Sequence, residues 1–160
     1  MRRDAIDHLL IDSLTASPRS RRVAMVTETY PPEVNGVAMS MARMVEGLHE
    51  RHHDVQLVRP HQRLAPGRHP EAPYDEVLTG GCAIPRYPHL RMGLPCKRTL
   101  LRLWSKRRPD VVHIATEGPL GWAALQASRQ LNLPVTTDFR TNFHAYGQHY
   151  GIGWLTQPIL

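Results

Sequence analysis

The sequence has few cysteines and few aromatic residues, and it contains no long apolar run. Cys82 and Cys96 are the only cysteines among 160 residues, which excludes a disulfide scaffold and a zinc site with four cysteine ligands. No stretch of about 18 apolar residues is present, so the sequence predicts no transmembrane helix. Two free thiols without a disulfide framework are typical of a cytosolic protein.

The amino-terminal residues lack the features of a secretory signal peptide, because Asp4, Asp7 and Asp12 interrupt their short apolar part. The segment ends in a polar run with Ser, Pro and Arg, which predicts a flexible tail over residues 1–21. The remaining residues, 22–160, have the length and composition of one globular domain, since 41% of the chain is apolar and 21% is charged.

Acidic residues are absent from residues 86–108, which carry eight Arg or Lys side chains. The pattern predicts an amphipathic helix over 96–108 with Leu100, Leu103 and Trp104 facing inward. Its outer face would carry basic residues four apart in the sequence, which are Arg98, Arg102 and Lys106. This face suits an anionic membrane surface, and it suits equally a solvated helix surface.

Nucleic acid is not an expected partner of this basic segment. The sequence has no helix-turn-helix, zinc or RNP pattern. Aromatic residues make up 6% of the chain, which is too few for a platform that stacks single-stranded bases.

Strand and helix patterns alternate along the chain. β-rich runs occupy 22–29, 54–60, 110–116 and 134–140, a weaker extended stretch covers 76–87, and helical patterns occupy 37–51, 96–108 and 119–132. This order predicts an α/β fold, a Rossmann-like parallel sheet with helices on both faces. A further helical pattern of lower regularity begins after Thr141. The loops that follow the strands meet at one edge of such a sheet, where ligands bind.

The loop after the first strand, YPPEVNG, is the most informative one. Neither G-x-G-x-x-G nor a P-loop motif is present, which disfavours a standard NAD-binding domain and a P-loop NTPase. Gly36 precedes a helix whose free N–H groups could bind an anion, and a residue without Cβ lets a phosphate come close. A tight turn that requires glycine is the alternative explanation.

Three blocks of sequence resemble the family-4 glycosyltransferases, in the same order along the chain. They are TETYPPEVNGVAMSMARMVEGLHERHHDVQLVRP, PDVVHIATEGPLGWAALQASRQLNLPV and DFRTNFHAYGQHYGIGWL, and together they span about residues 22–157. The last block is most similar to the α-mannosyltransferase branch. The resemblance implies the amino-terminal, acceptor-side half of a two-domain GT-B fold. It also implies retaining transfer of a hexose, mannose above all, from GDP-mannose or a UDP-sugar to a lipid or glycan acceptor.

The resemblance implies roles for individual residues on the loops. Asn35 and Gly36 fall where the family places its glycine-rich loop beside the donor diphosphate, and many members have two glycines there. Tyr30 and Glu117 fall on the acceptor side of the cleft. Glu117 could bind an acceptor hydroxyl, or it could instead cap the helix that begins near Pro119. The resemblance implies neither a metal nor any cofactor beyond the nucleotide-sugar substrate.

The predicted catalytic residues follow the last strand. Arg140 stands where many family members have a histidine followed by Thr, and here Thr141 follows it. Arginine does not act as a base near neutral pH, but it can neutralise a phosphate or bind a sugar hydroxyl. His144 lies four residues further on and would share a helical face with Arg140. His113, within a buried strand pattern, is expected to be a core histidine.

Residues that the family uses to bind the donor lie mostly in a carboxy-terminal domain, which includes two glutamates spaced E-x7-E. No two glutamates in this sequence have that spacing. We therefore expect a truncated chain that is inactive alone and needs the missing lobe, in the same or a separate chain. Its expected location is cytoplasmic, on the inner membrane face. The alternative is a non-enzymatic basic α/β module that binds an anionic membrane surface or another protein.

Overall fold

The centre of the fold is a five-stranded parallel sheet with the strand order β3-β2-β1-β6-β7. The computed structural model describes residues 19–62, 72–84 and 87–138. The sheet strands are β1 (Arg22–Val26), β2 (Asp54–Pro60), β3 (Asp75–Thr79), β6 (Val111–Ile114) and β7 (Val135–Thr137). All four neighbouring pairs are parallel, which confirms the fold class predicted from the alternating strand and helix patterns.

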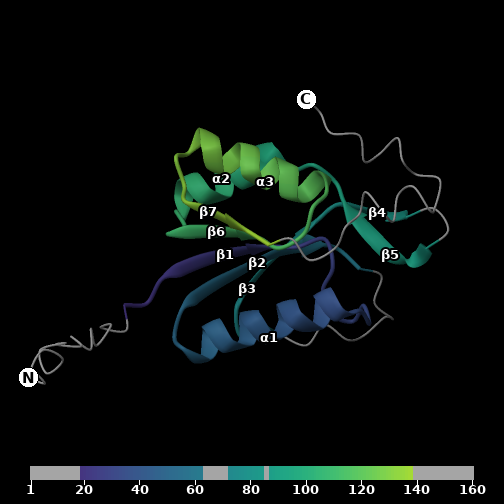
Figure 1. Ribbon diagram of the computed structural model, residues 1–160. Helices are drawn as coiled ribbons and strands as arrows, with labels where there is room; N and C mark the ends of the chain where they lie inside the picture. Colours follow the sequence, from purple (N-terminus) through teal and green to yellow (C-terminus); the bar gives the residue numbers. More distant parts are fainter. Residues whose placement is uncertain (1–18, 63–71, 85–86, 139–160) are drawn as a thin grey trace, which may run out of the picture.

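Helices cover both faces of the sheet. They are α1 (Gly36–Glu50), α2 (Lys97–Lys106) and α3 (Pro119–Gln130). Figure 1 shows α1 below the sheet, with α2 and α3 side by side above it. This arrangement follows from the connections, because α1 links β1 to β2 on one side of β1, while α3 follows β6 on its other side.

Apolar side chains form two core layers, one on each face of the sheet. Below it, Met41 and Val45 of α1 pack with Met25 and Leu57 of the strands. Above it, Leu100, Trp104 and Leu120 join strand residues such as Val112 in a second cluster. Trp104 is fully buried, and its Nε1 donates a hydrogen bond to Gln56 Oε1 at 3.0 Å. The one polar atom of the largest buried side chain therefore has a hydrogen-bond partner within the core.

The extended stretch predicted over 76–87 is more complex than the sequence pattern suggested. It contains β3, β4 (Gly81–Ile84) and the first residue of β5 (Tyr87–Gly93). β4 and β5 pair antiparallel as a separate two-stranded sheet beside the carboxyl end of the main sheet (Figure 1). Gly80 separates β3 from the hairpin, which begins at Gly81, so the chain leaves the main sheet there.

Helix α2 has the predicted amphipathic character. Leu100 and Trp104 are fully buried, Leu103 is partly buried, and the three outward basic side chains, Arg98, Arg102 and Lys106, are exposed. The neighbouring Arg107 differs from them, because it forms ion pairs with Asp54 and Asp75. One of the eight basic residues of 86–108 is therefore balanced by acids from elsewhere in the chain.

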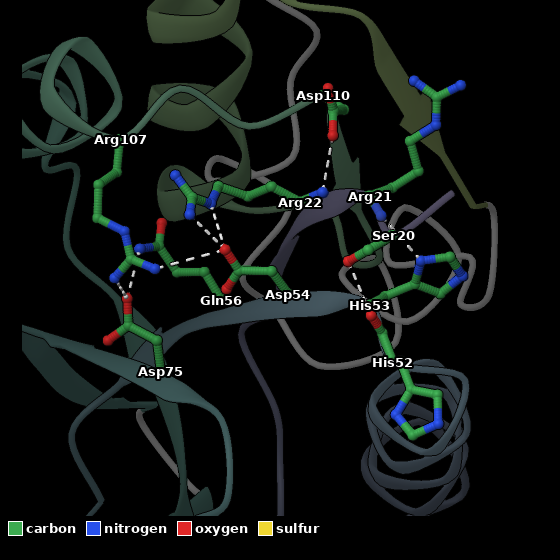
Figure 2. Close-up of polar contacts among 10 residues, drawn as sticks. All are labelled: Ser20, Arg21, Arg22, His52, His53, Asp54, Gln56, Asp75, Arg107 and Asp110. Carbon is green, nitrogen blue, oxygen red and sulfur yellow. Dashed lines mark hydrogen bonds and ion pairs between the residues drawn. The ribbon is translucent and has the colours of Figure 1, made fainter. Parts of the chain in front are cut away.

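The amino-terminal edge of the sheet carries this ion-pair network, which Figure 2 shows in close-up. Arg22 on β1 and Arg107 after α2 both bind Asp54, which begins β2. Ser20 Oγ donates to the carbonyl oxygen of His52 at 2.8 Å, and the Arg21 amide donates to His53 Nδ1 at 3.1 Å. The last residues of the expected flexible tail are thus held against the domain, whereas residues 1–18 lie outside the described residues.

Candidate functional site

The opposite, carboxyl-terminal edge of the sheet is where the candidate site residues gather. The strand order reverses between β1 and β6, which neighbour each other but are followed by helices on opposite faces. Crevices at such reversal points bind ligands in open α/β sheets. The N-termini of α1 and α3 lie at this edge, and they differ in how their amide groups are used.

Asn35 caps helix α1. Its Oδ1 accepts the Ala38 amide at 2.8 Å, and its Nδ2 donates to Thr29 Oγ1 at 2.8 Å. The Thr29 hydroxyl in turn donates to Glu33, which is 9% exposed. Both polar atoms of the Asn35 side chain therefore already have hydrogen-bond partners in the loop and the helix. A ligand at this helix end would be bound by backbone groups instead.

Gly36 is the first residue of α1, and nothing in the described structure requires glycine there. Its φ lies outside the left-handed region, and a Cβ built at this position meets no atom within 4 Å. The tight-turn explanation is therefore wrong. Within the described residues, the amides of Gly36 and Val37 have no acceptor. The helix thus presents exposed N–H groups beside open space, as an anion site requires.

The N-terminus of α3 is occupied by a side chain of the protein itself. Glu28, 7% exposed and two residues beyond β1, accepts the Leu120 amide at 2.9 Å through Oε1. Its Oε2 accepts the amide of Gly93 at the end of β5. Burial raises the pKa of Glu28 to about 7, although these backbone N–H donors act in the opposite direction. An anion from solution would have to displace this carboxylate.

Glu117 lies on the loop between β6 and α3, and it is exposed. The residue that precedes α3 is Gly118, and α3 has no side-chain cap hydrogen bond. The alternative that Glu117 caps this helix is therefore wrong, since Glu28 fills that position. Glu117 instead borders an open hollow of about 210 Å³, together with Trp122 and Asp138. Trp122 is 48% exposed, which leaves an aromatic surface beside two carboxylates.

Tyr30 lies in the core beside α1, unlike the other acceptor-side candidate. Its side chain is 6% exposed, its hydroxyl lies 2.6 Å from that of Tyr74, and Arg59 stacks over its ring at 5.6 Å. Burial first, and then the hydrogen bond with Tyr74, raise the pKa of Tyr30. Its contact with an acceptor stays a prediction, and it would require this tyrosine pair to open.

The two predicted catalytic residues, Arg140 and His144, lie outside the described residues, as does the helical pattern after Thr141. The described chain reaches Asp138, just after β7. His113 is a half-buried strand histidine, as expected. Its Nδ1 lies 2.9 Å from Thr136 Oγ1, and its Nε2 lies 3.5 Å from the Asp138 carboxylate.

Glu28 lies at the carboxyl-terminal edge of the sheet with the candidate site residues, and the sequence analysis did not predict its role there. Its place near the end of a β-rich run resembles that of many exposed residues at strand ends. Its partners, Leu120 and Gly93, are 92 and 65 residues away in the chain and contribute only backbone amides. A pattern of side chains carries no signal for such contacts.

Comparison with known proteins identifies the family of the chain. The profile of the Glycosyltransferase Family 4 matches residues 34–160. The chain belongs to glycosyltransferase family 4. A GDP-mannose-dependent alpha-mannosyltransferase of Mycolicibacterium smegmatis is 32% identical over 139 residues, which cover 82% of this chain and 36% of that protein. The enzyme of the same description from Corynebacterium glutamicum is 32% identical over 144 residues, covering 82% and 32%.

The family-4 chain is also similar to a glycolipid-forming enzyme. The alpha-monoglucosyldiacylglycerol synthase of Acholeplasma laidlawii is 30% identical over 139 residues, covering 85% of this chain and 33% of that protein. The chain thus spans about one third of the length of the curated relatives it matches. No helix among the described residues is long and apolar enough to cross a membrane.

Proposed function

We propose that this chain forms the acceptor-side domain of a retaining hexosyltransferase and that the donor diphosphate binds at the N-terminus of α1. The observation that carries this proposal is the environment of Gly36. The position is exposed, a Cβ there would meet nothing within 4 Å, and the first two amides of α1 have no acceptor among the described residues. Because the fold of the domain does not require glycine at this position, we attribute its presence to a ligand that approaches the backbone closely.

The comparison of the two helix ends supports this location of the donor. A diphosphate needs N–H donors and a favourable helix dipole, and both α1 and α3 direct these toward the carboxyl edge. At α3 the buried Glu28 carboxylate already accepts the Leu120 amide. At α1 the Asn35 side chain uses only the Ala38 amide, which leaves the first turn accessible.

We further propose mannose as the transferred sugar, with GDP-mannose as the donor and a UDP-sugar as the alternative. The names of the mannosyltransferase relatives support the first choice. The acceptor is proposed to be a lipid or a glycan, and the similarity to a monoglucosyldiacylglycerol synthase supports a lipid. Glu117, exposed beside the hollow at α3, would accept a hydrogen bond from an acceptor hydroxyl.

The proposed mechanism depends on positioning and on stabilisation of the leaving diphosphate. The acceptor oxygen would bond to the anomeric carbon as the bond from that carbon to the diphosphate breaks, and an oxygen of the leaving diphosphate would take the acceptor proton. The domain then needs neither a nucleophile nor a general base of its own, and no metal or further cofactor is proposed. Of the two predicted catalytic residues, the Arg140 guanidinium would neutralise phosphate charge, and His144 would take part in the same step. A second lobe, in the same or a separate chain, would supply the remaining donor contacts.

A chimera tests the proposal. Residues 22–157 would replace the matched segment of the Mycolicibacterium smegmatis relative, so that its remaining part supplies the second lobe. We expect transfer of labelled mannose from GDP-mannose, and less from UDP-glucose, to acceptors offered as diacylglycerol vesicles or as mannosyl glycans. A folded chimera that transfers no sugar from either donor to either acceptor would refute the proposal, provided the parent enzyme is active in the same assay.

A second proposal concerns the location of the domain, and α2 supports it. The exposed face with Arg98, Arg102 and Lys106 has no acidic partner among the described residues, so these charges are available to an anionic lipid surface. Each basic residue near such a surface contributes about 1 kcal/mol, screened by salt. This attraction would hold the domain on the inner face of the membrane, beside a lipid acceptor. Vesicle sedimentation with and without salt tests it.

A further inference from the structure

Glu28 joins three elements of the carboxyl edge that are far apart in the sequence. Its backbone amide donates to Thr116 Oγ1 at 2.7 Å, which links the end of β1 to the loop after β6. Its carboxylate accepts the Leu120 amide in the first turn of α3 and the Gly93 amide at the end of β5. One buried side chain therefore connects the central strand, the β4–β5 hairpin and the helix that follows Glu117.

Two glycines surround this carboxylate closely, and both are required by it. A Cβ at Gly93 would lie 2.7 Å from Glu28 Oε2 and 2.8 Å from Leu120 Cβ. A Cβ at Gly118 would overlap Oε1, and its φ of 153° is one that residues with a side chain rarely adopt. The backbone on both sides is thus fitted around the Glu28 side chain.

The backbone groups around this position suit a side chain that offers two acceptor oxygens. Both oxygens accept backbone N–H groups, and the positive end of the α3 dipole lies beside them. Helix α3 has no acidic residue in its own first turn and no side-chain cap. A glutamine would offer one acceptor and one NH₂ group, so one of the two amides would face a donor instead of an acceptor.

We infer that Glu28 is a positioning residue, which holds the loop 116–118 and the end of the β4–β5 hairpin in place and thereby orients Glu117 toward the acceptor. This inference rests on the proposed function for the role of Glu117, but not for the structural link itself. Glu28 would contact no reacting atom of the donor or the acceptor. Its effect reaches the acceptor side through Gly118 and the first turn of α3.

The structural link is tested in the 160-residue chain by amide hydrogen exchange at pH 8, where the Glu28 carboxyl is ionised. In Glu28→Gln we expect the Gly93 and Leu120 amides to exchange about tenfold faster, because each loses its charged acceptor or faces a donor. Asp54→Asn is the matched control, since it removes a carboxylate from the ion pairs at the opposite edge. It should leave both amides unchanged.

The positioning role is tested by kinetics in the chimera. We expect Glu28→Gln to raise the KM for the acceptor about fivefold or more while the KM for GDP-mannose stays within about twofold, because the Glu28 carboxylate accepts amides of β5 and α3 and none of α1 among the described residues. Asp54→Asn should change neither constant. Glu28→Asp keeps both acceptor oxygens on a side chain one methylene shorter, and we expect it to restore part of the acceptor affinity. It also replaces Glu28→Gln should that variant fail to fold.

The possible results separate this inference from the proposed function. Unchanged exchange at Gly93 and Leu120 in both Glu28 variants would refute the structural link. Faster exchange with an unchanged acceptor KM would refute the positioning role. A chimera without any transfer activity would refute the proposed function, while the exchange experiment would still decide whether Glu28 holds the two elements together.

Discussion

Substitution of Gly36 by alanine separates a ligand contact from a structural requirement. The methyl group would enter open space, since no atom of the domain lies within 4 Å of it. Alanine is favoured over glycine in a helix by roughly 0.5–1 kcal/mol. For a domain of this size, 1 kcal/mol shifts the melting temperature by about 2–4 °C. We therefore expect Gly36→Ala to melt about 1–4 °C higher than the unmodified chain.

The same variant should bind the donor more weakly. A diphosphate oxygen that accepts the first amides of α1 would come within contact distance of the new methyl group. Loss of one hydrogen bond to a charged group costs about 1.5–3 kcal/mol, which is roughly a 10- to 100-fold increase in the KM for GDP-mannose. A protein that becomes more stable while its donor affinity falls cannot owe that loss to unfolding.

Gly47→Ala is the matched control for this experiment. Gly47 lies near the other end of α1, where a Cβ would approach only the flexible Arg51 side chain, at 3.2 Å. We expect a similar gain in melting temperature and an unchanged KM for the donor. Thermal unfolding of the chain and donor kinetics of the chimera provide the two measurements. An unchanged donor KM in Gly36→Ala would refute the assignment of the diphosphate to this helix end.

Four further predictions concern stability, activity and location. Because burial raises the pKa of Glu28 from 4.5 to about 7, the folded chain binds its proton more tightly than the unfolded chain. Its free energy of unfolding should thus fall by up to about 3 kcal/mol as the pH rises through that window, and urea titrations of Glu28→Gln should lack this slope. Trp104→Ala should cost about 3–5 kcal/mol in urea unfolding, because it opens a cavity and leaves Gln56 Oε1 unpaired. The 160-residue chain alone should transfer no sugar from GDP-mannose or UDP-glucose, and turnover by the purified chain would contradict its dependence on a second lobe. Binding to anionic vesicles should be lost near 1 M salt, and also in a variant in which Arg98, Arg102 and Lys106 are all changed to glutamine. If that variant sediments with the vesicles as much as the unmodified chain does, the membrane role of α2 is refuted and its basic face is a solvated helix surface.

The main sheet and its helices could be predicted because their signals are local. The β2 pattern coincides with the observed strand, and the periodic burial of Leu100 and Trp104 places α2 correctly. The β4–β5 hairpin was harder to predict, because glycines and prolines interrupt its sequence and its pairing is antiparallel in an otherwise parallel fold. Strand breaks can be read from such residues, but the partner of each short strand cannot.

The residues of the candidate site also fall into those with local sequence signals and those that depend on distant contacts. The loop before α1 could be identified from Asn35 and Gly36, since helix caps and glycines have characteristic local patterns. Glu117 was placed on the correct loop, but its proposed capping role was wrong because a residue from a distant strand end occupies that position. Contacts between a side chain and remote backbone amides depend on the assembled fold, and sequence spacing does not encode them.

The N-termini of α1 and α3 at the carboxyl edge therefore differ in what occupies them, despite similar electrostatics. Each directs N–H groups and a positive dipole end toward the crevice, so each would attract an anion. At α3 the Glu28 side chain of the protein itself accepts the Leu120 amide. At α1 the first turn is open, and Gly36 allows an external anion to approach. A diphosphate that entered this edge would consequently find the first turn of α1 open, whereas the first turn of α3 is already in contact with Glu28.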